Sequence, residues 1–405
     1  MSASGLILHP AEPPPPAARL GPAGWARQHL FNSRTSGVIT VLLVITLAAL
    51  LAIIASWALT SARWGVVTDN LRLFLIGLYP PAEAWRPWLG LMVVSTLTGF
   101  SAGTWGGPLR TTAVWLGAAQ LLLAGLMLAS PMGPVPAFGM VLGAGVIGAG
   151  AMAARRRPPS RRLLRWAWLG SLPLVWLLLG GITDGVVLPP VGTDLWGGLL
   201  LTLVLASVSI VLSFPLGVLL ALGRRSSLPV VRILCTGFIE VVRGVPLVTI
   251  IYLADIMLPL FLPGDVRIDR VIRAIGGLTL FSAAYLAENV RGGLQAIPRG
   301  QLEAAHALGL GAIAIHRFIV LPQALRMTIP ANVGLFISLL KDTTLVIIVG
   351  LLEILGIGRA VLAQPEWLGA QVEVYVFIAV VFFVLCWTIS QASYRLEATL
   401  GVGRR

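Results

Sequence analysis

Side chains that could do chemistry are scarce in this sequence, and their spacing forms no catalytic or metal-binding set. The 405 residues include only four histidines and two cysteines. The histidines are scattered: His9, His29, His306 and His316. Cys235 and Cys386 lie in or beside apolar segments, without the spacing of a disulfide framework or a zinc site. We therefore predict no catalytic residue, no metal site and no cofactor on this chain.

One stretch matches a nucleotide-binding sequence pattern but lacks the structural context that the pattern requires. Gly143 to Gly148 reads G-A-G-V-I-G, which fits the dinucleotide fingerprint G-x-G-x-x-G. No strand–helix unit is predicted around it, and no acidic residue follows at about 20 residues, as the fingerprint requires. A membrane helix in which small residues allow close helix packing explains the stretch better. The pattern G-x-x-x-x-G-K-[ST] is excluded because the only lysine is Lys341, so any ATP chemistry must reside on another chain.

Two adjacent charges, Lys341 and Asp342, lie deep inside the apolar segment 327–352. They are about 15 residues into it, or roughly 22 Å at a rise of 1.5 Å per residue. Charges at such depth in a bilayer are costly and usually face a bundle interior or a cavity. Two roles fit equally well, which are lining a solute pathway and forming a buried ion pair that braces a subunit interface. Asp255, midway along another apolar segment, is a weaker pathway candidate.

Composition places these residues in a membrane protein. Hydrophobic residues make up 57% of the chain and charged residues 11%, and the mean hydropathy is +0.91. Soluble domains carry roughly 25% charged residues. The net charge of +13 could indicate a nucleic-acid partner, but the arginines cluster at the ends of apolar runs. That distribution is typical of charges that set orientation in a bilayer, so we predict no nucleic-acid binding.

The elements that position the candidate residues are predicted to be membrane-spanning helices. Ten apolar segments have about the 20 residues that a bilayer core requires. They are 37–60, 87–105, 112–130, 135–153, 163–180, 196–222, 245–262, 271–286, 327–352 and 375–392. Residues 71–78 are expected at the membrane interface. Arginines concentrate on the side that this layout makes cytoplasmic, most densely at 155–165, so both termini are predicted to be cytoplasmic.

A polar loop between the eighth and ninth predicted spans has the pattern of a compact helix–turn–helix. It reads E-A-A-H-A-L-G-L-G-A-I-A-I-H-R-F-I-V-L-P from Glu303 to Pro322. Good helix formers precede Gly309, and a glycine there can end one short helix and let the next leave at an angle. Pro322 is expected to stop the second helix. The arginine bias places the loop in the cytoplasm, where it would form a knob for a soluble partner.

The spacing of this loop, E-A-A-x3-G-x9-I-x-L-P, resembles the coupling loop of permease subunits of bacterial ATP-binding-cassette importers. Further motifs resemble the polar-amino-acid branch of these permeases over about 194–396: E-V-V-R-G-V-P-L at 240–247, Y-L-A-E-N-V-R-G-G at 285–293 and L-L-K-D-T-T-L at 339–345. The extra N-terminal spans, Y-P-P at 79–81, W-R-P-W at 85–88 and the ending at 367–397 are similar to one subfamily. It is the longer permease of general L-amino-acid or glutamate/glutamine/aspartate importers.

The resemblance implies an all-α polytopic integral membrane protein of about ten transmembrane helices. Its last five helices would form a MetI-like importer-permease core with a cytoplasmic coupling helix. The implied domains are a disordered cytoplasmic tail (1–36), an accessory transmembrane region (37–186), the permease core (187–400) and a short cytoplasmic tail (401–405). The implied location is the bacterial cytoplasmic, or inner, membrane.

The resemblance also implies roles for individual residues. The residues coupling the chain to an ATPase would be Glu303, Ala304, Ala305, Gly309, Leu321 and Pro322. Ala304 and Ala305 would allow close approach, and an ion pair between Glu303 and Arg299 would add at most about 0.5 kcal/mol. Lys341, Asp342 and Asp255 are the candidates for the substrate pathway.

The implied activity is import of polar or acidic L-amino acids by alternating access, driven by a separate ATPase, so the chain itself is not an enzyme. The implied partners are a second homologous permease, a cytoplasmic ATP-binding dimer, a periplasmic amino-acid-binding protein, the amino acid and membrane lipid. A carrier driven by an ion gradient should show two similar halves, and only one half has the Glu303 loop. A membrane-embedded enzyme should show acids or histidines clustered at one membrane face, and the scattered histidines do not support it.

Overall fold

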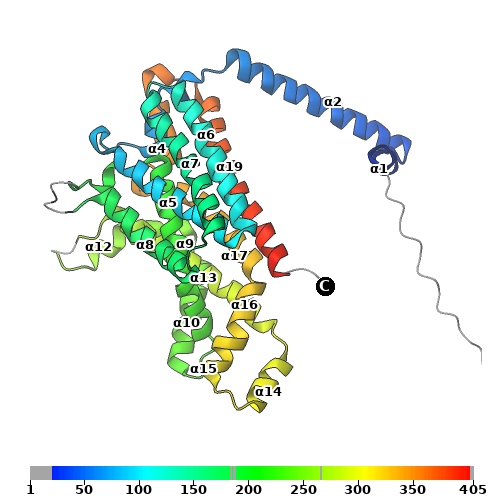
Figure 1. Ribbon diagram of the computed structural model, residues 1–405, viewed down its shortest axis with the longest axis vertical. Helices are drawn as coiled ribbons and strands as arrows, with labels where there is room; N and C mark the ends of the chain where they lie inside the picture. The colour runs from blue at the N-terminus through cyan, green and yellow to red at the C-terminus, as the bar shows by residue number, and fades with distance from the viewer. Residues whose placement is uncertain (1–20, 183–184, 186–187, 265–266, 402–405) are drawn as a thin grey trace, which may run out of the picture. The chain divides into compact units, whose positions relative to one another are not determined.

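The computed structural model describes residues 21–401 apart from 183–184, 186–187 and 265–266. The described residues are helical and form no strand, and an isolated bridge links Gly198 with Glu353. The predicted all-α fold is therefore confirmed. The chain divides into two units, Met1–Ala62 and Arg63–Arg405 (Figure 1).

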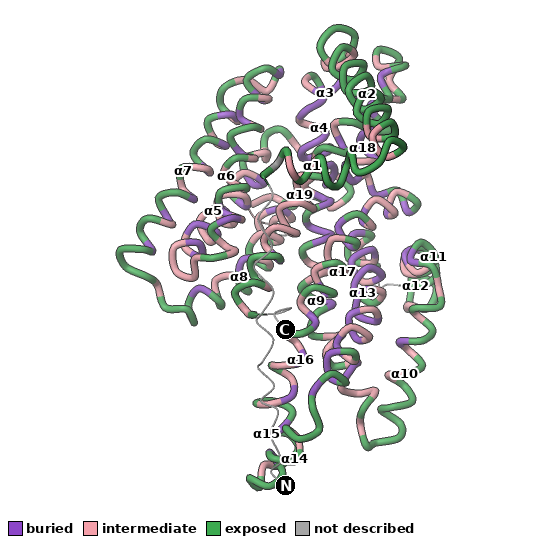
Figure 2. Tube along the Cα trace, turned by 90° about the vertical axis from the view of Figure 1, so that its right-hand side faces the viewer, coloured by how far each residue is buried: buried purple, intermediate pink, exposed green. Residues whose placement is uncertain are grey.

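The first unit contains α1 (Pro22–His29), α2 (Arg34–Ser56) and the π-helical turn η1 (Trp57–Ser61). Ser33 starts α2, because its hydroxyl accepts the N–H of Ser36 at 3.1 Å. No residue of α2 is buried (Figure 2), and its exposed residues are mostly large and apolar, as expected for a helix surrounded by lipid. The helix α1 corrects the prediction of a disordered tail over 1–36. Residues 1–20 and 402–405 of the two predicted tails lie outside the described residues.

Among the described residues, eight helices are long and apolar enough to span a membrane, or nine if a bent pair counts as one span. These are α2 with η1, α6 (Gly107–Leu128), α7 (Pro134–Arg156), α8 (Arg161–Gly180), α9 (Gly198–Gly223), α13 (Arg270–Gln295), α17 (Ile329–Asp342) continued by η6 (Thr343–Val349), and α19 (Gln371–Leu400). The short helices that lie between these spans along the chain include α3 (Gly65–Thr68), α4 (Leu71–Ile76), η2 (Pro81–Glu83), η3 (Thr193–Leu195), α18 (Ile354–Leu362) and η7 (Pro365–Trp367). α13 is the span most enclosed by protein (Figure 2).

The predicted span 87–105 forms α5 (Trp85–Trp105), which is helical but less apolar than the eight spans. Two of its buried serines accept hydrogen bonds from neighbouring helices: Gln120 of α6 donates to Ser95 at 2.7 Å, and Trp168 of α8 donates to Ser101 at 2.9 Å. Because α5 lies among α6, α7 and α8, it can carry polar residues that a lipid-facing helix could not.

The predicted span 245–262 is one limb of a bent element. α10 (Pro229–Gly244) and the run α11 (Leu247–Tyr252), η4 (Leu253–Met257) and α12 (Leu258–Leu260) meet at an angle of 108°. Val245 has extended backbone at the bend. A residue that precedes proline disfavours the helical conformation, so Pro246 accounts for the break.

Small residues bring α5 and α7 into close contact. A side-chain carbon added at Gly99 would lie 2.5 Å from the Ile147 carbonyl oxygen, and one at Gly103 would lie 2.5 Å from that of Ala151. The stretch from Gly143 to Gly148 lies inside α7. It is a glycine-rich part of a membrane helix, as predicted, and no strand precedes it among the described residues.

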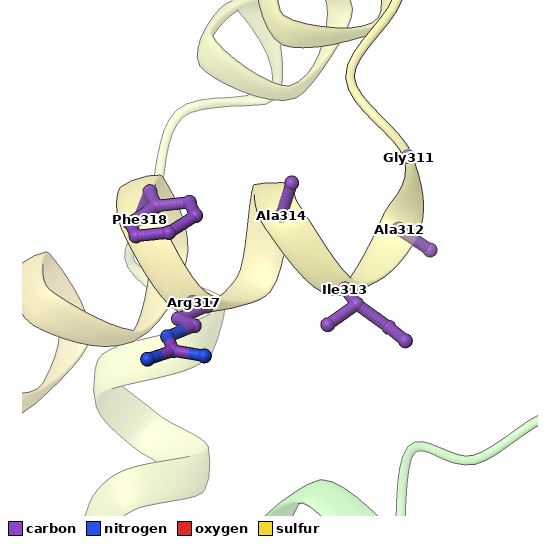
Figure 3. A pocket seen from close by; sticks show the side chains of 6 residues that line it. All are labelled: Gly311, Ala312, Ile313, Ala314, Arg317 and Phe318. Atoms are coloured by element: carbon purple, nitrogen blue, oxygen red, sulfur yellow. The ribbon is translucent and has the colours of Figure 1, made fainter.

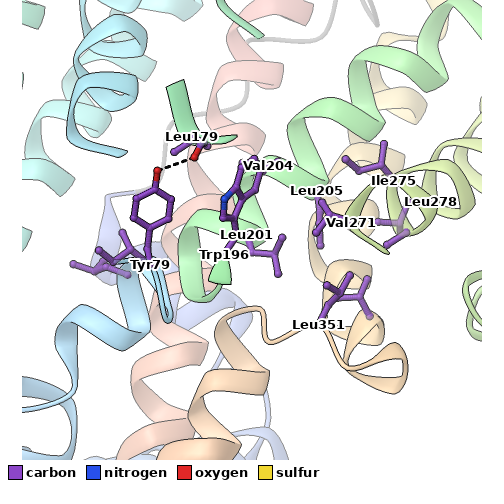
Figure 4. Packing of buried hydrophobic residues seen from close by; sticks show 14 of the residues in the cluster. Tyr79, Leu179, Trp196, Leu201, Val204, Leu205, Val271, Ile275, Leu278 and Leu351 are labelled. Atoms are coloured by element: carbon purple, nitrogen blue, oxygen red, sulfur yellow. Dashed lines mark hydrogen bonds between the residues drawn. The ribbon is translucent and has the colours of Figure 1, made fainter. Parts of the chain in front are cut away.

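Within the second unit, one continuous apolar core joins the helices before residue 190 to those after it. Figure 4 shows Tyr79 and Leu179 beside Trp196 and Leu201, with Leu278 further along the same cluster. The Tyr79 hydroxyl donates to the Leu179 carbonyl at 2.7 Å, and burial raises the pKa of this phenol.

The segment 71–78, which we expected at the membrane interface, is largely buried within the protein. Leu71 and Phe74 of α4 are fully enclosed, and α4 packs on α9 and α18. A buried arginine holds the next segment: Arg86 contacts Glu83 at 2.8 Å and donates to the Pro189 carbonyl at 2.8 Å. The W-R-P-W motif therefore anchors the start of α5 to the connection that precedes α9.

Candidate functional site

The predicted helix–turn–helix forms between α13 and α17. α14 (Arg299–Ala307) is followed by α15 (Ala312–Ile315), the π-helical turn η5 (His316–Val320) and α16 (Leu321–Met327). Gly309 has a φ of +74°, and the Leu310 N–H donates to the Ala305 carbonyl at 3.2 Å. This bonding ends a helix at a left-handed residue, which confirms the predicted role of the glycine. In Figure 1, α14 and α15 project from the second unit beyond α10 and α16.

The prediction for Pro322 is wrong. This proline lies in the first turn of α16, where a residue without an N–H is tolerated, so it starts a helical segment instead of stopping one. The wider turn of η5 precedes it and lets the helical path continue from α15 into α16.

The six predicted coupling residues do not share one face. Ala305 is buried in a cluster with Ile315 and Ala324, so it packs the loop against its own chain. Leu321 is half-buried. The remaining four are exposed: Glu303, Ala304, Gly309 and Pro322.

The loop is braced by an amide contact and not by the expected ion pair. Gln323 of α16 donates to Gln301 of α14 at 2.6 Å. Within the part of the chain that the structure describes, no ion pair joins Glu303 to Arg299. Glu303 is therefore left exposed on the projecting helix.

Exposed apolar residues on this loop escaped the sequence reasoning. Leu308 is 79% exposed, Ile313 85% and Phe318 70%. Figure 3 shows the last two beside an open hollow, whose lining is Gly311, Ala312, Ile313, Ala314, Arg317 and Phe318. The helical period was the available signal, because Ile315 and Ile319 occupy the buried face and leave Ile313 and Phe318 off it.

A charge cluster lies where α9, α10 and α13 meet, and the sequence did not reveal its centre. Glu288 of α13 contacts Arg224 at 3.4 Å and Arg243 at 3.5 Å, and it also pairs with Arg291. Arg224 contacts Glu240 of α10 at 3.1 Å. The two motifs at 240–247 and 285–293 are thus joined directly by Arg243 and Glu288, and also through Arg224, a residue outside both.

Lys341 and Asp342 occupy the last turn of α17, where the helix tightens into η6. Lys341 is exposed on the single chain and Asp342 is half-buried. Within the described residues neither forms an ion pair with the other or with Asp255. The structure therefore leaves both charges unneutralised by ion pairs of this subunit.

Asp255 is held differently. It is buried in η4, and its Oδ1 lies 3.1 Å from Arg273 and 3.8 Å from Arg270, both on α13. Arg273 also donates to the Asp255 carbonyl. These contacts tie the bent element to α13, and they make Asp255 less available to a solute than Lys341 or Asp342.

Comparison with known proteins gives matches that cover nearly the whole chain. The family described as "Binding-protein-dependent transport system inner membrane component" matches residues 213–397. The inner membrane amino-acid ABC transporter permease protein YhdY of Escherichia coli is 36% identical over 98% of each chain. The glutamate/glutamine/aspartate/asparagine transport system permease protein BztC of Rhodobacter capsulatus is 36% identical, over 96% of this chain and 95% of its own.

Shorter proteins match only part of the chain. The probable glutamine ABC transporter permease protein GlnP of Bacillus subtilis is 36% identical over 50% of this chain and 92% of its own. A crystal structure of an amino acid ABC transporter is 29% identical over 50% of this chain and 92% of that one, with a TM-score of 0.45. Since relatives above 30% identity align along almost its entire length, this chain belongs to the amino-acid ABC transporter permeases, multi-pass proteins of the inner membrane.

Proposed function

We propose that this chain is the translocating subunit of an importer for polar or acidic L-amino acids, and that a separate ATPase drives it. Its partners would be a second homologous permease, a dimer of cytoplasmic ATP-binding subunits and a periplasmic amino-acid-binding protein. The names of the relatives support the substrate class, because one is a glutamate/glutamine/aspartate/asparagine permease and another a glutamine permease. The proposal places both termini and the Glu303 loop in the cytoplasm.

The observation that carries the proposal is the exposed apolar surface on the projecting loop. Ile313 and Phe318 are mostly exposed, and the charged residue Glu303 lies on the neighbouring helix α14. Large apolar side chains on a segment outside the membrane spans are typical of a protein–protein contact. A groove on an ATPase subunit would bury them.

Force on this loop can reach the spans through direct contacts. α14 follows α13 after a short turn, and Gln301 connects α14 to Gln323 of α16. Ala305, Ile315 and Ala324 form one apolar cluster with residues of α13. A rigid displacement of the loop would therefore move the ends of α13 and α16 together. In the proposed cycle, this movement exchanges the outward-facing and inward-facing states.

Lys341 and Asp342 are the proposed groups for the amino acid's charged carboxylate and ammonium. Their support is their depth in a span and the absence of an ion partner within the described part of this subunit. Asp255 is the third candidate, with weaker support because two arginines already contact it.

Association with the ATPase tests the proposal. The chain would be co-expressed with its candidate ATPase and binding protein, and the complex purified through a tag on the permease. The double substitution Ile313→Asp/Phe318→Asp should lower the amount of co-purified ATPase at least tenfold, since it puts charge on the surface to be buried. Leu368→Asp is the matched control, because Leu368 is 63% exposed, apolar and outside the spans at the start of α19.

Uptake into proteoliposomes gives the second measurement. Glutamate, glutamine and aspartate should enter only with ATP and the binding protein present, and the double substitution should abolish entry. Uptake that continues without any ATPase would refute the proposal in favour of a gradient-driven carrier. Equal loss of ATPase with Leu368→Asp would refute the role of the loop.

A further inference from the structure

Six arginines lie within 11 residues at the turn between α7 and α8. They are Arg155, Arg156, Arg157, Arg161, Arg162 and Arg165, and all are exposed. Within the described ranges, none has a carboxylate within ion-pair distance. The arginines around Glu288 differ in this respect, because each contacts a glutamate. The α7–α8 turn therefore presents a concentrated positive charge with no counter-charge from its own chain.

The side chains on one face of α8 form a hollow with two chemical parts. Its lining is Arg162, Arg165, Trp166 and Leu169, at positions i, i+3, i+4 and i+7. The two guanidinium groups stand at the start of the helix, and the indole and the leucine follow within about 10 Å along its axis. Trp166 and Leu169 are more than half exposed. The hollow thus passes from charged to apolar in the direction in which α8 enters the membrane.

The position of Arg165 leaves donors free for an anion. Its Nε donates to the Arg161 carbonyl at 3.2 Å, which holds the side chain beside the first turn of α8. Its terminal amino groups have no partner within the part of the chain that the structure describes. Arginine presents a planar set of donors that matches phosphate oxygens, and two neighbouring guanidinium groups can share one phosphate.

From this arrangement we propose that the α8 face of Arg162, Arg165, Trp166 and Leu169 binds an anionic phospholipid. The phosphate of the head group contacts the two arginines, Trp166 lies at the level of the glycerol, and an acyl chain follows Leu169. Tryptophan favours this depth of a bilayer, and basic hollows beside membrane helices favour anionic head groups. A soluble acidic protein fits less well, because α8 is a candidate span and such a partner could not reach Leu169.

The test uses the full-length chain, purified in mild detergent with any subunits that accompany it. Native mass spectrometry would measure binding of added phosphatidylglycerol and of phosphatidylcholine with the same acyl chains. Wild-type protein should bind phosphatidylglycerol at least tenfold more tightly. Arg162→Gln/Arg165→Gln should weaken this binding at least fivefold and leave phosphatidylcholine binding unchanged.

The matched control is Arg110→Gln/Arg232→Gln, which removes the same charge from two exposed arginines without ion pairs in the described structure. It should change phosphatidylglycerol binding less than twofold. If the glutamine pair at 162 and 165 fails to fold, Arg162→Lys/Arg165→Lys carries the test. This variant keeps the charge but loses the paired donors, and it should weaken binding about threefold.

Several results would overturn the proposal. If Arg162→Gln/Arg165→Gln and Arg110→Gln/Arg232→Gln weaken phosphatidylglycerol binding equally, the effect comes from overall surface charge and not from this face of α8. Equal affinity of the wild-type protein for both lipids would refute the contact between the head group and the arginines. Displacement of the lipid by soluble glycerophosphate at equal concentration would refute the contact with the acyl chain. Loss of a co-purified protein subunit with lipid binding unchanged would identify the face as a protein-docking surface instead.

Discussion

Within the second unit, the helices before residue 190 and those after it are joined by different polar contacts. In the first set, α5 and α7 approach closely at Gly99 and Gly103, and neutral hydrogen bonds link the spans, while the buried ion pair of Glu83 and Arg86 stays within one short stretch at the start of α5. In the second set, ion pairs join different helices: Asp255 to Arg273, and Glu288 to Arg224 and Arg243.

The difference indicates different mechanical roles. Backbones that touch along their length have few alternative arrangements, because a small shift makes atoms overlap. Partly exposed ion pairs, such as those of Glu288 with Arg224 and Arg243, can lengthen or exchange partners at small cost. We therefore expect the first set to act as a fixed frame and the second set to rearrange during transport. Four tests by mutation address this contrast.

The largest effect is expected in the fixed frame. Gly99→Ala places a methyl group 2.5 Å from the backbone oxygen of Ile147, which cannot move aside as a side chain can. The free energy of unfolding should fall by about 3 kcal/mol, the upper part of the range for overpacking. Titration with sodium dodecyl sulfate in mixed micelles would measure it. Gly145→Ala is the matched control, because no atom lies within 4 Å of its added carbon, and an unchanged Gly99→Ala protein would contradict close packing.

The next effect concerns the charge cluster of the second set. Glu288→Gln leaves Arg224, Arg243 and Arg291 without their shared carboxylate. The Glu288 side chain is 22% exposed, so water screens part of the lost interaction. We expect the free energy of unfolding to fall by about 2 kcal/mol. Import should fall more steeply than ATPase association. Glu240→Gln is the control, because its side chain is 61% exposed and contacts only Arg224, and similar effects of both changes would argue against Glu288 as the centre.

Exchange of the two deep charges tests the pathway directly. Lys341→Asp/Asp342→Lys keeps the net charge of α17 but inverts its order along the helix. Import of glutamate should fall at least tenfold, equivalent to about 1.4 kcal/mol, since the amino acid would meet the opposite charge at each position. Uptake and unfolding would be measured on the same preparation. Unchanged uptake would exclude the pathway role and leave the interface-bracing role.

The smallest effect concerns a hydrogen bond within the first set, next to its apolar contact with the second set. Tyr79→Phe removes the hydrogen bond to the Leu179 carbonyl and leaves that acceptor buried. The free energy of unfolding should fall by about 1 kcal/mol, with import unchanged, if the contact belongs to the frame. Tyr394→Phe is the control, since Tyr394 is 64% exposed. A selective loss of import would place Tyr79 among the moving parts instead.

Features that depend on neighbours along the chain could be predicted from the sequence. Hydropathy predicted the helical, membrane-spanning class, and local turn chemistry predicted the end of α14 at Gly309, because both signals act within a few residues. Motif spacing indicated the permease family. The same local reasoning misplaced Pro322, since a proline that ends one helix is also well suited to begin another.

Features that depend on distant neighbours became visible in the folded chain. The burial of α4, the enclosure of α5 and the different exposure of Ala304 and Ala305 follow from which helices surround them. Arg224 meets Glu288 across 64 positions of the chain, and no local pattern encodes that distance. The solvation of a side chain depends on all the groups packed around it. The exposure and the partners of Arg224 and Glu288 are therefore set only when α9, α10 and α13 pack together.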